Sequence, residues 1–129
     1  MPDLPVVVPP GTLRLEIDEP KDKRLTTSSG MIRGWFAARD IDLPEEFHFE
    51  IGKTIVPHRI LKREDVEGAM PGHSVMGFGI LYDLSLYLPY IEENGLAIRL
   101  ILPEYPTRTL RFTITEGALV NCLAAASDM

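Results

Sequence analysis

The sequence GMIRGWFAA, residues 30–38, decides how this chain folds. Alternate residues of a strand point to opposite sides of a sheet, so Ile32 and Phe36 share one side while Trp35 lies on the other. Large apolar groups on both sides are typical of a central strand rather than a sheet edge. Gly34, next to the chain's one tryptophan, allows a bulge or a close approach of another backbone. We therefore predict a β-domain built around this strand.

Alternating apolar residues predict further strands before and after this segment. These strands cover residues 12–18, 47–51, 54–56, 77–84, 96–102 and 108–115. Gly52 and Lys53 separate two of them, and a two-residue loop that starts with glycine is typical of a type II′ hairpin turn. About seven strands with little helix between them predict an immunoglobulin-like antiparallel β-sandwich.

The chain divides into three parts. Residues 1–11 are rich in proline and end in Pro-Pro-Gly, so we expect an extended lead-in. Residues 12–116 contain the predicted strands and form the sandwich domain; within them, residues 62–68 are charged and fit one helical turn. Residues 117–126 look helical, and residues 117–129 form either a C-terminal tail or the start of a following segment.

Charge and composition restrict the classes of partner. The chain has 13 Lys and Arg against 19 Asp and Glu, a net charge of −6. Phosphate groups are bound by concentrated Lys and Arg, so nucleic acid and anionic membranes are not expected partners. Cys122 is the single cysteine and cannot form an internal disulfide, which fits a reducing compartment. With no recognisable signal sequence or membrane-spanning pattern, we predict a cytoplasmic protein.

The residue types that enzymes use show no catalytic pattern. Cys122 has no histidine near it in sequence, and Ser74 stands in a turn without a nucleophile motif. The paired carboxylates at 45–46 and 92–93 are consecutive, so they point in different directions and need not flank a bond. We therefore predict a protein that is not an enzyme and that has no cofactor.

Three residues on the predicted hairpin could approach a metal. His48 and Glu50 share the outward side of one strand, and His58 follows the next. Zinc usually takes four ligands, and no further ligand is evident at a suitable spacing. A solvated polar surface is the favoured interpretation, and a small enzyme using these three residues is a remote alternative.

Tyrosines provide the candidate contacts for a sugar. Tyr87, Tyr90 and Tyr105 lie in predicted loops, where a ring can stack on a saccharide and a hydroxyl can hydrogen-bond to it. Tyr82 lies on the apolar side of a strand and is expected in the core. The alternative is that each loop tyrosine packs its ring against the end of the sandwich and keeps only its hydroxyl in water.

Four short motifs together resemble a known family. They are Gly30 with Gly34-Trp35, then Gly52, then Arg63 with Asp65-Val66, and then Gly77-Phe78. Across residues 12–115 the chain resembles bacterial immunoglobulin-like β-sandwich domains. Such domains occur beside glycosyltransferase, methyltransferase or sulfotransferase domains in proteins of surface-polysaccharide synthesis.

This resemblance implies a non-catalytic accessory domain that contacts a neighbouring domain, a protein partner or a second copy of itself. A carbohydrate-binding module is the alternative. The motif residues Trp35, Arg63, Asp65, Gly77 and Phe78 are expected to be structural. We expect Trp35 in the core, Asp65 as a cap of its local turn, and Arg63 stacked on an aromatic ring such as Trp35 or bonded to nearby carbonyls.

Overall fold

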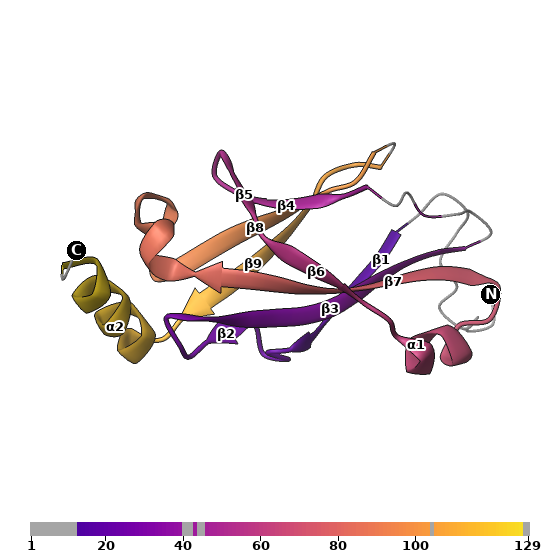
Figure 1. Ribbon diagram of the computed structural model, residues 1–129, viewed down its shortest axis with the longest axis horizontal. Helices are drawn as coiled ribbons and strands as arrows, with labels where there is room; N and C mark the ends of the chain where they lie inside the picture. The colour runs from indigo at the N-terminus through magenta and orange to yellow at the C-terminus, as the bar shows by residue number, and fades with distance from the viewer. Residues whose placement is uncertain (1–12, 40–42, 44–45, 104, 128–129) are drawn as a thin grey trace, which may run out of the picture.

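Two β-sheets face each other and enclose the main hydrophobic core (Figure 1). The computed structural model describes residues 13–39, 43, 46–103 and 105–127, with side chains as far as residue 124. The first sheet has four antiparallel strands, in the order β1 (Leu13–Glu19), β3 (Ser29–Arg39), β7 (His73–Asp83) and β6 (His58–Leu61). The second has five, in the order β2 (Arg24–Leu25), β9 (Arg108–Ile114), β8 (Gly95–Ile101), β4 (His48–Ile51) and β5 (Thr54–Val56). The predicted all-β, sandwich-like class is confirmed.

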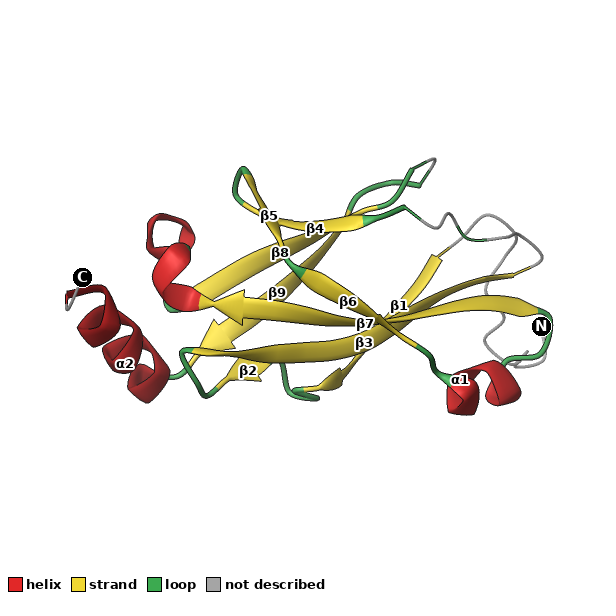
Figure 2. Cartoon of the chain, viewed as in Figure 1, coloured by secondary structure: helices red, strands yellow, loops and turns green. Residues whose placement is uncertain are grey.

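Short helices occupy the ends of the sandwich (Figure 2). At one end α1 (Glu64–Ala69) follows β6 and leads into β7. At the other end η1 (Leu84–Leu86) and η2 (Leu88–Tyr90) connect β7 to β8, and α2 (Glu116–Ser127) packs against η1. Among the described residues, helix is therefore confined to connections and to the segment after β9.

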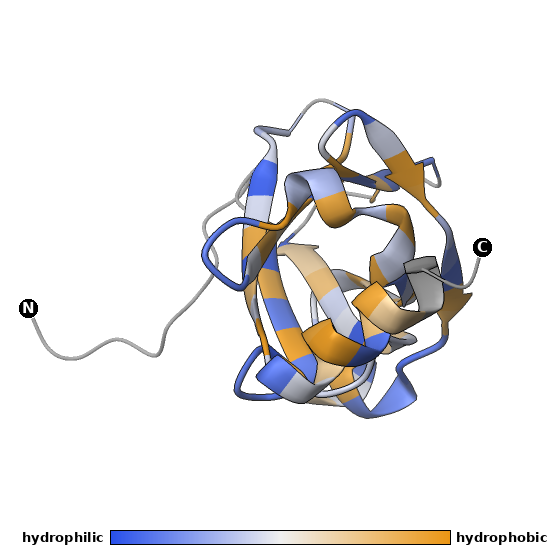
Figure 3. Cartoon of the chain, turned by 90° about the vertical axis from the view of Figure 1, so that its left-hand side faces the viewer, coloured by the Kyte–Doolittle hydropathy of each residue, from blue (hydrophilic) through white to orange (hydrophobic). Residues whose placement is uncertain are grey.

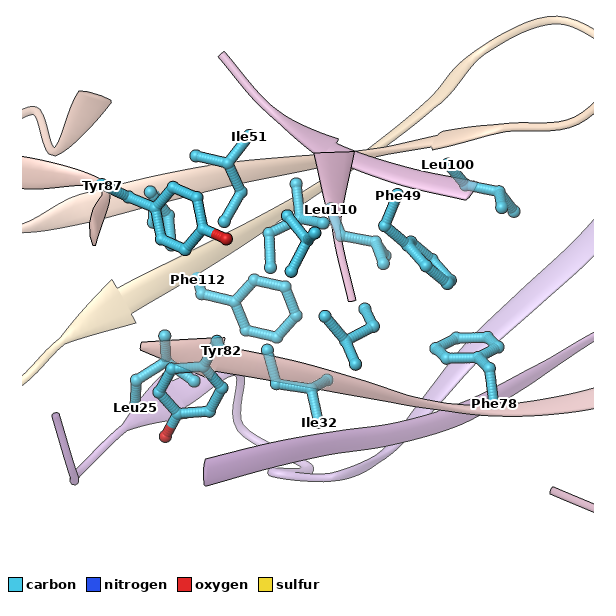
Figure 4. Close-up of a cluster of buried hydrophobic side chains, with 14 of the residues drawn as sticks. Leu25, Ile32, Phe49, Ile51, Phe78, Tyr82, Tyr87, Leu100, Leu110 and Phe112 are labelled. Atoms are coloured by element: carbon cyan, nitrogen blue, oxygen red, sulfur yellow. The ribbon is translucent and has the colours of Figure 1, made fainter. Parts of the chain in front are cut away.

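The strand β3 lies in the middle of the first sheet, as its two apolar sides predict. It pairs with β1 on one side and with β7 on the other. Ile32 and Phe36 are completely buried between the sheets, where Phe36 lies 6.1 Å from Phe78 between ring centroids. Phe78 in turn lies 4.8 Å from Phe49 of the second sheet, so aromatic contacts join the two sheets (Figure 4).

The predicted hairpin is confirmed. β4 and β5 are joined by Gly52 and Lys53, with Ile51 opposite Thr54. Gly52 has a φ of +60°, as the first position of a type II′ turn requires. A glycine is needed there because a side chain at this φ would be strained.

Two short strands lie outside the predicted set. β2 has only two residues, and it pairs in parallel with β9. β6 begins directly after Pro57, where the chain leaves the second sheet and pairs with β7 of the first. The sequence did not predict β6 because its Arg59 and Ile60 are both exposed, so the usual alternation is absent.

The tryptophan lies outside the core between the sheets, which corrects the prediction. Trp35 is on the outer side of the first sheet, in a second apolar cluster with Ala37 and Val66. Val66 comes from α1, so this helix packs on the tryptophan, which is only 7 % exposed. Alternation correctly placed Trp35 opposite Phe36, but it gave no sign that α1 covers this outer side of the sheet.

The predicted C-terminal helix is present and packs onto the sandwich. Ala118 and Cys122 are completely buried and belong to the main core. They lie on α2, which crosses the end of the sandwich near η1; Figure 3 looks onto this end. In that view the strands change repeatedly between hydrophilic and hydrophobic residues, as half-buried strands do.

Candidate functional site

A groove opens on the outer side of the second sheet, which we call the Tyr90 groove. It has a volume of about 600 Å³. Its lining residues come from η2, from the turn that follows it, and from β8 and β9; they are Tyr90, Glu92, Glu93, Gly95, Leu96, Ala97, Arg111, Phe112 and Thr113. Ala97 stands opposite Arg111 in the β8–β9 pair, and Gly95 stands opposite Thr113. The small residues at 95 and 97 leave room between the longer side chains.

The ring of Tyr90 is held at the edge of this groove by the β4–β5 turn. A side chain at Gly52 would overlap the Tyr90 ring, so the ring packs directly on the glycine. Tyr90 nevertheless remains 38 % exposed. The glycine that makes the hairpin turn therefore also provides the surface against which the exposed tyrosine rests.

A tight turn positions the two glutamates of the groove. The N–H of Glu92 donates to the carbonyl of Gly95 at 3.0 Å, and the N–H of Gly95 donates back at 2.7 Å. Between them Glu93 and Asn94 have φ values of +50° and +60°. Positive φ at both central residues is the pattern of a type I′ turn, so the backbone of this turn places both glutamates in the lining of the groove.

The three candidate tyrosines do not form one binding surface. Tyr87 is only 2 % exposed and lies among the core side chains in Figure 4, so it cannot stack on a ligand, which corrects that expectation. Tyr105 is half-buried in the loop after β8, whereas Tyr90 precedes β8. Tyr82 is buried as predicted, and its hydroxyl lies 2.9 Å from that of Thr27. Of the three candidates, only Tyr90 lines the groove.

A charged network occupies the neighbouring part of the same outer surface. His48 Nε2 lies 2.7 Å from Glu50 Oε2, and Arg99 Nη2 donates to Glu50 Oε1 at 3.0 Å. Arg99 also donates to the carbonyl of Gly52. This network joins β4 to β8 and fixes the turn on which Tyr90 rests.

His58 does not join His48 and Glu50. Its ring packs against Phe47, with 4.7 Å between the ring centroids, and edge-on to Phe49. Burial, followed by the charge of His48, lowers the pKa of His58 from 6.5. Among the described residues no group of three His, Cys, Asp or Glu side chains is arranged to hold a metal ion.

Arg63 pairs with carboxylates instead of stacking on Trp35, which corrects the predicted contact. Arg63 donates to both carboxylate oxygens of Asp65, at 3.1 and 2.9 Å, and also bonds to Asp18 of β1. These bonds raise the pKa of Arg63, and the bond from Arg63 lowers the pKa of Asp65. Asp65 lies in the first turn of α1, where hydrogen bonds from the backbone N–H groups of Val66 and of Asp65 itself also lower its pKa. The arginine stacked over Trp35 is Arg14, 5.3 Å from the ring centroid.

Cys122 lies in the core and is a poor nucleophile. It is completely buried, and this burial raises the pKa of its thiol. The thiolate is the reactive form, so a buried thiol with a raised pKa reacts slowly. Its contribution is to packing.

Large apolar side chains are exposed where η1 meets α2. Leu86 is 65 % exposed, Val120 is 57 % exposed and Leu123 is 49 % exposed. We call these three residues the apolar end. On the β5 and β6 side of the sandwich, Ile55 and Ile60 are also exposed, at 63 % and 58 %.

Comparisons with protein-family models, with curated proteins and with solved structures found no match to this chain. None of the helices in the described part of the chain is long and apolar enough to span a membrane.

Proposed function

We propose that this chain is a non-catalytic interaction domain with an immunoglobulin-like topology. The strand orders support the topology. The order β1-β3-β7-β6 corresponds to strands A, B, E and D of that fold, while β9, β8 and β4 correspond to G, F and C. β5 then has the position of C′, which pairs with C at the edge of the same sheet.

Two features differ from antibody domains. Those domains have a buried tryptophan on strand C that packs against a disulfide between the sheets. Here the corresponding strand β4 contributes Phe49 to the core, and Trp35 lies on the outer side of β3. The chain has one cysteine, so a core of aromatic and aliphatic side chains replaces the disulfide.

The apolar end is the observation that carries the proposed function. Leu86, Val120 and Leu123 come from η1 and α2, two elements that pack together, so these three exposed side chains lie at the same end of the sandwich. Gathered apolar groups mark sites where proteins associate, whereas single exposed ones are ordinary. The partner is a protein or a neighbouring domain, and the resemblance to accessory domains suggests a bacterial, cytoplasmic enzyme of glycan synthesis.

Site-specific photocrosslinking tests this function. A photoreactive amino acid is placed at Leu86 or Leu123 in cells that make the protein, and at the exposed Arg59 as the control position. We expect a single dominant protein adduct from the apolar end and not from position 59. The purified partner should then bind the wild-type domain, and binding should be lost in the Leu86→Ser, Leu123→Ser double variant.

Equal crosslinking at the control position would contradict an interaction surface at this end. The non-catalytic part of the proposal has its own test, in which the purified domain is incubated with nucleotide-sugars and acceptor glycans. Measurable turnover would contradict it.

A further inference from the structure

We propose that the Tyr90 groove is a binding site for a neutral saccharide. The groove shares no lining residue with the apolar end, so this site is separate from the proposed protein contact. Its volume of about 600 Å³ is within the range of about 300–1,000 Å³ that small-ligand sites have. The class of ligand follows from the chemistry of the lining.

The first requirement for a sugar is a fixed aromatic ring. The pyranose ring presents C–H groups on its faces and hydroxyls around its rim, so it stacks on an aromatic surface and hydrogen-bonds at its edge. Tyr90 provides the aromatic surface, because its ring rests on Gly52 and is still 38 % exposed. Arg99 holds the carbonyl of Gly52, so the turn under the ring is itself anchored. A ring that is already held in place loses little conformational freedom when a ligand binds.

The second requirement is hydrogen-bonding groups of both kinds around that ring. Glu92 and Glu93 supply acceptor oxygens, and Arg111 supplies several donors. A sugar hydroxyl both donates and accepts, so it can use either side of the groove. The Thr113 hydroxyl adds a group that can do both.

The charges and the scarce apolar surface of the lining favour a neutral polar ligand over the rival classes. A phosphate or an acidic sugar would face two carboxylates with only Arg111 to offset them. A lysine-rich peptide would be repelled by Arg111, which stands opposite Ala97 in the middle of the sheet surface. An acyl chain would find little apolar lining, because Leu96 and Phe112 turn their side chains into the core. A neutral polyol is repelled by none of these groups.

The small residues on β8 make the fit possible. Gly95 and Ala97 allow the ligand to approach the sheet between Tyr90 and Arg111. A larger side chain at position 97 would fill this space without touching the core, since Ala97 lies on the outer side of β8. The Ala97→Leu variant therefore blocks the groove while leaving Tyr90 in place.

Nuclear magnetic resonance titration of the purified protein tests the proposal. The probes are the methyl glycosides of glucose, galactose, mannose and N-acetylglucosamine, together with cellobiose and maltose. Inorganic phosphate, methyl glucuronide and trilysine represent the rival classes. We expect at least one neutral sugar to shift the amide signals of Gly95, Ala97 and Thr113, and the rival probes to leave them unchanged.

Variants connect the signal to the groove. Tyr90→Ala should weaken binding at least about tenfold, the order of loss when one stacking ring is removed. Ala97→Leu should abolish binding with the tyrosine intact, and circular dichroism should show both variants folded. Thr109→Ala, on the outer side of β9 but outside the groove, is the matched control and should bind as the wild type does.

The proposal is overturned if no neutral sugar shifts these amides, or if Tyr90→Ala and Ala97→Leu bind as tightly as the wild type. It is also overturned if phosphate, glucuronide or trilysine binds the groove in preference. None of these results bears on crosslinking at Leu86 and Leu123, so the two proposals fail independently.

Discussion

Single residues explain how the outer side of the first sheet can be covered. Gly77 faces Trp35 across the β3–β7 pair. A Cβ at this glycine would collide with the carbonyl of Leu61 and with the side chain of Arg63. The side chain of Arg63 therefore passes over β7 at Gly77, where the strand has no side chain to obstruct it. The motif glycine is needed for this close approach, and not for an unusual φ.

Replacing Gly77 with alanine should destabilise the fold. The added methyl group overlaps backbone atoms that cannot move away easily, and overpacking of this kind costs about 1–3 kcal/mol. Urea denaturation measures the free energy of unfolding. Gly68→Ala is the matched control, because a Cβ at Gly68 would meet nothing within 4 Å and alanine favours helix. Equal stabilities of the two variants would contradict the proposed crowding at Gly77.

His58 should make the stability depend on pH. Its pKa is lowered in the folded protein, first by burial and then by the charge of His48, so the unfolded chain takes up the proton more readily. The contribution of His58 to stability is therefore complete above pH 6.5, the ordinary pKa, and is lost as the pH falls below that value toward the folded-state pKa.

The His58→Phe variant retains a ring against Phe47 but cannot titrate. The free energy of unfolding is measured from pH 8 to pH 5 for both proteins. We expect the value for the wild type to decrease relative to that of His58→Phe as the pH drops. His48→Gln should weaken this pH dependence without abolishing it, because burial is the larger cause of the lowered pKa of His58. A difference between wild type and His58→Phe that is constant with pH would count against this assignment.

At the scale of elements, α1 is the part that determines the environment of Trp35. Val66 is its buried residue and packs in the cluster of the tryptophan. Arg63, just before the helix, is bonded to Asp18 of β1 and to Asp65 of the helix. An apolar contact and a charged contact therefore hold a six-residue helix against the sheet.

Truncating Val66 to alanine should loosen this helix. Removing two buried methyl groups costs about 1–2 kcal/mol on transfer and cavity arguments. The single tryptophan should report the change directly, with an emission maximum at longer wavelength in the folded variant because water reaches the ring. Glu67→Ala, on the exposed side of the same helix, should change neither the stability nor the emission. Unchanged emission in Val66→Ala would mean that α1 does not shield Trp35.

On the scale of the whole molecule, the sandwich includes its C-terminal helix. Ala118 and Cys122 share the main core with residues of both sheets, and α2 packs on η1 near Tyr87. Tyr87 and Cys122 are therefore buried at the same end of the molecule. The outer side of the same helix carries Val120 and Leu123, so one element both closes the core and forms the apolar end.

The Cys122 thiol should therefore report on unfolding of the whole domain. It is completely buried and its pKa is raised, so a thiol reagent should react only when α2 separates from the core. We expect negligible reaction in native buffer, and a rate that rises in urea together with loss of the β circular dichroism signal. A Cys122→Ser, Thr109→Cys variant, with its thiol on the surface, should react at once. Rapid labelling of wild-type Cys122 without urea would show that the helix detaches on its own.

Sequence patterns predicted the elements well where local rules govern them. Strict alternation identified the strands that have one buried side, and Gly52 identified the hairpin turn because only certain residues tolerate its φ. The same rules missed β6. This edge strand is held by its pairing with β7, and its exposed Arg59 and Ile60 show no alternation of buried and exposed residues.

The candidate site was predictable only in part. Sequence singled out Tyr87, Tyr90 and Tyr105 together, because all three lie in connecting segments. It contained no signal that Tyr87 packs into the main core, or that Tyr90 rests on a glycine from a distant hairpin. Arg111 and Thr113 were missed because exposed polar residues on a strand look the same whether or not a groove lies beside them.

The order of residues in this chain is sufficient to specify a sandwich-like β-domain around the strand at residues 30–38, because alternation and turn chemistry act between neighbours along the chain. It is not sufficient to say what each side of a strand meets. Trp35 is buried under α1 rather than between the sheets, and Tyr90 is exposed beside carboxylates from another turn. Alternation states which residues share a side, while the packing of distant segments decides whether that side becomes core, cover or binding surface.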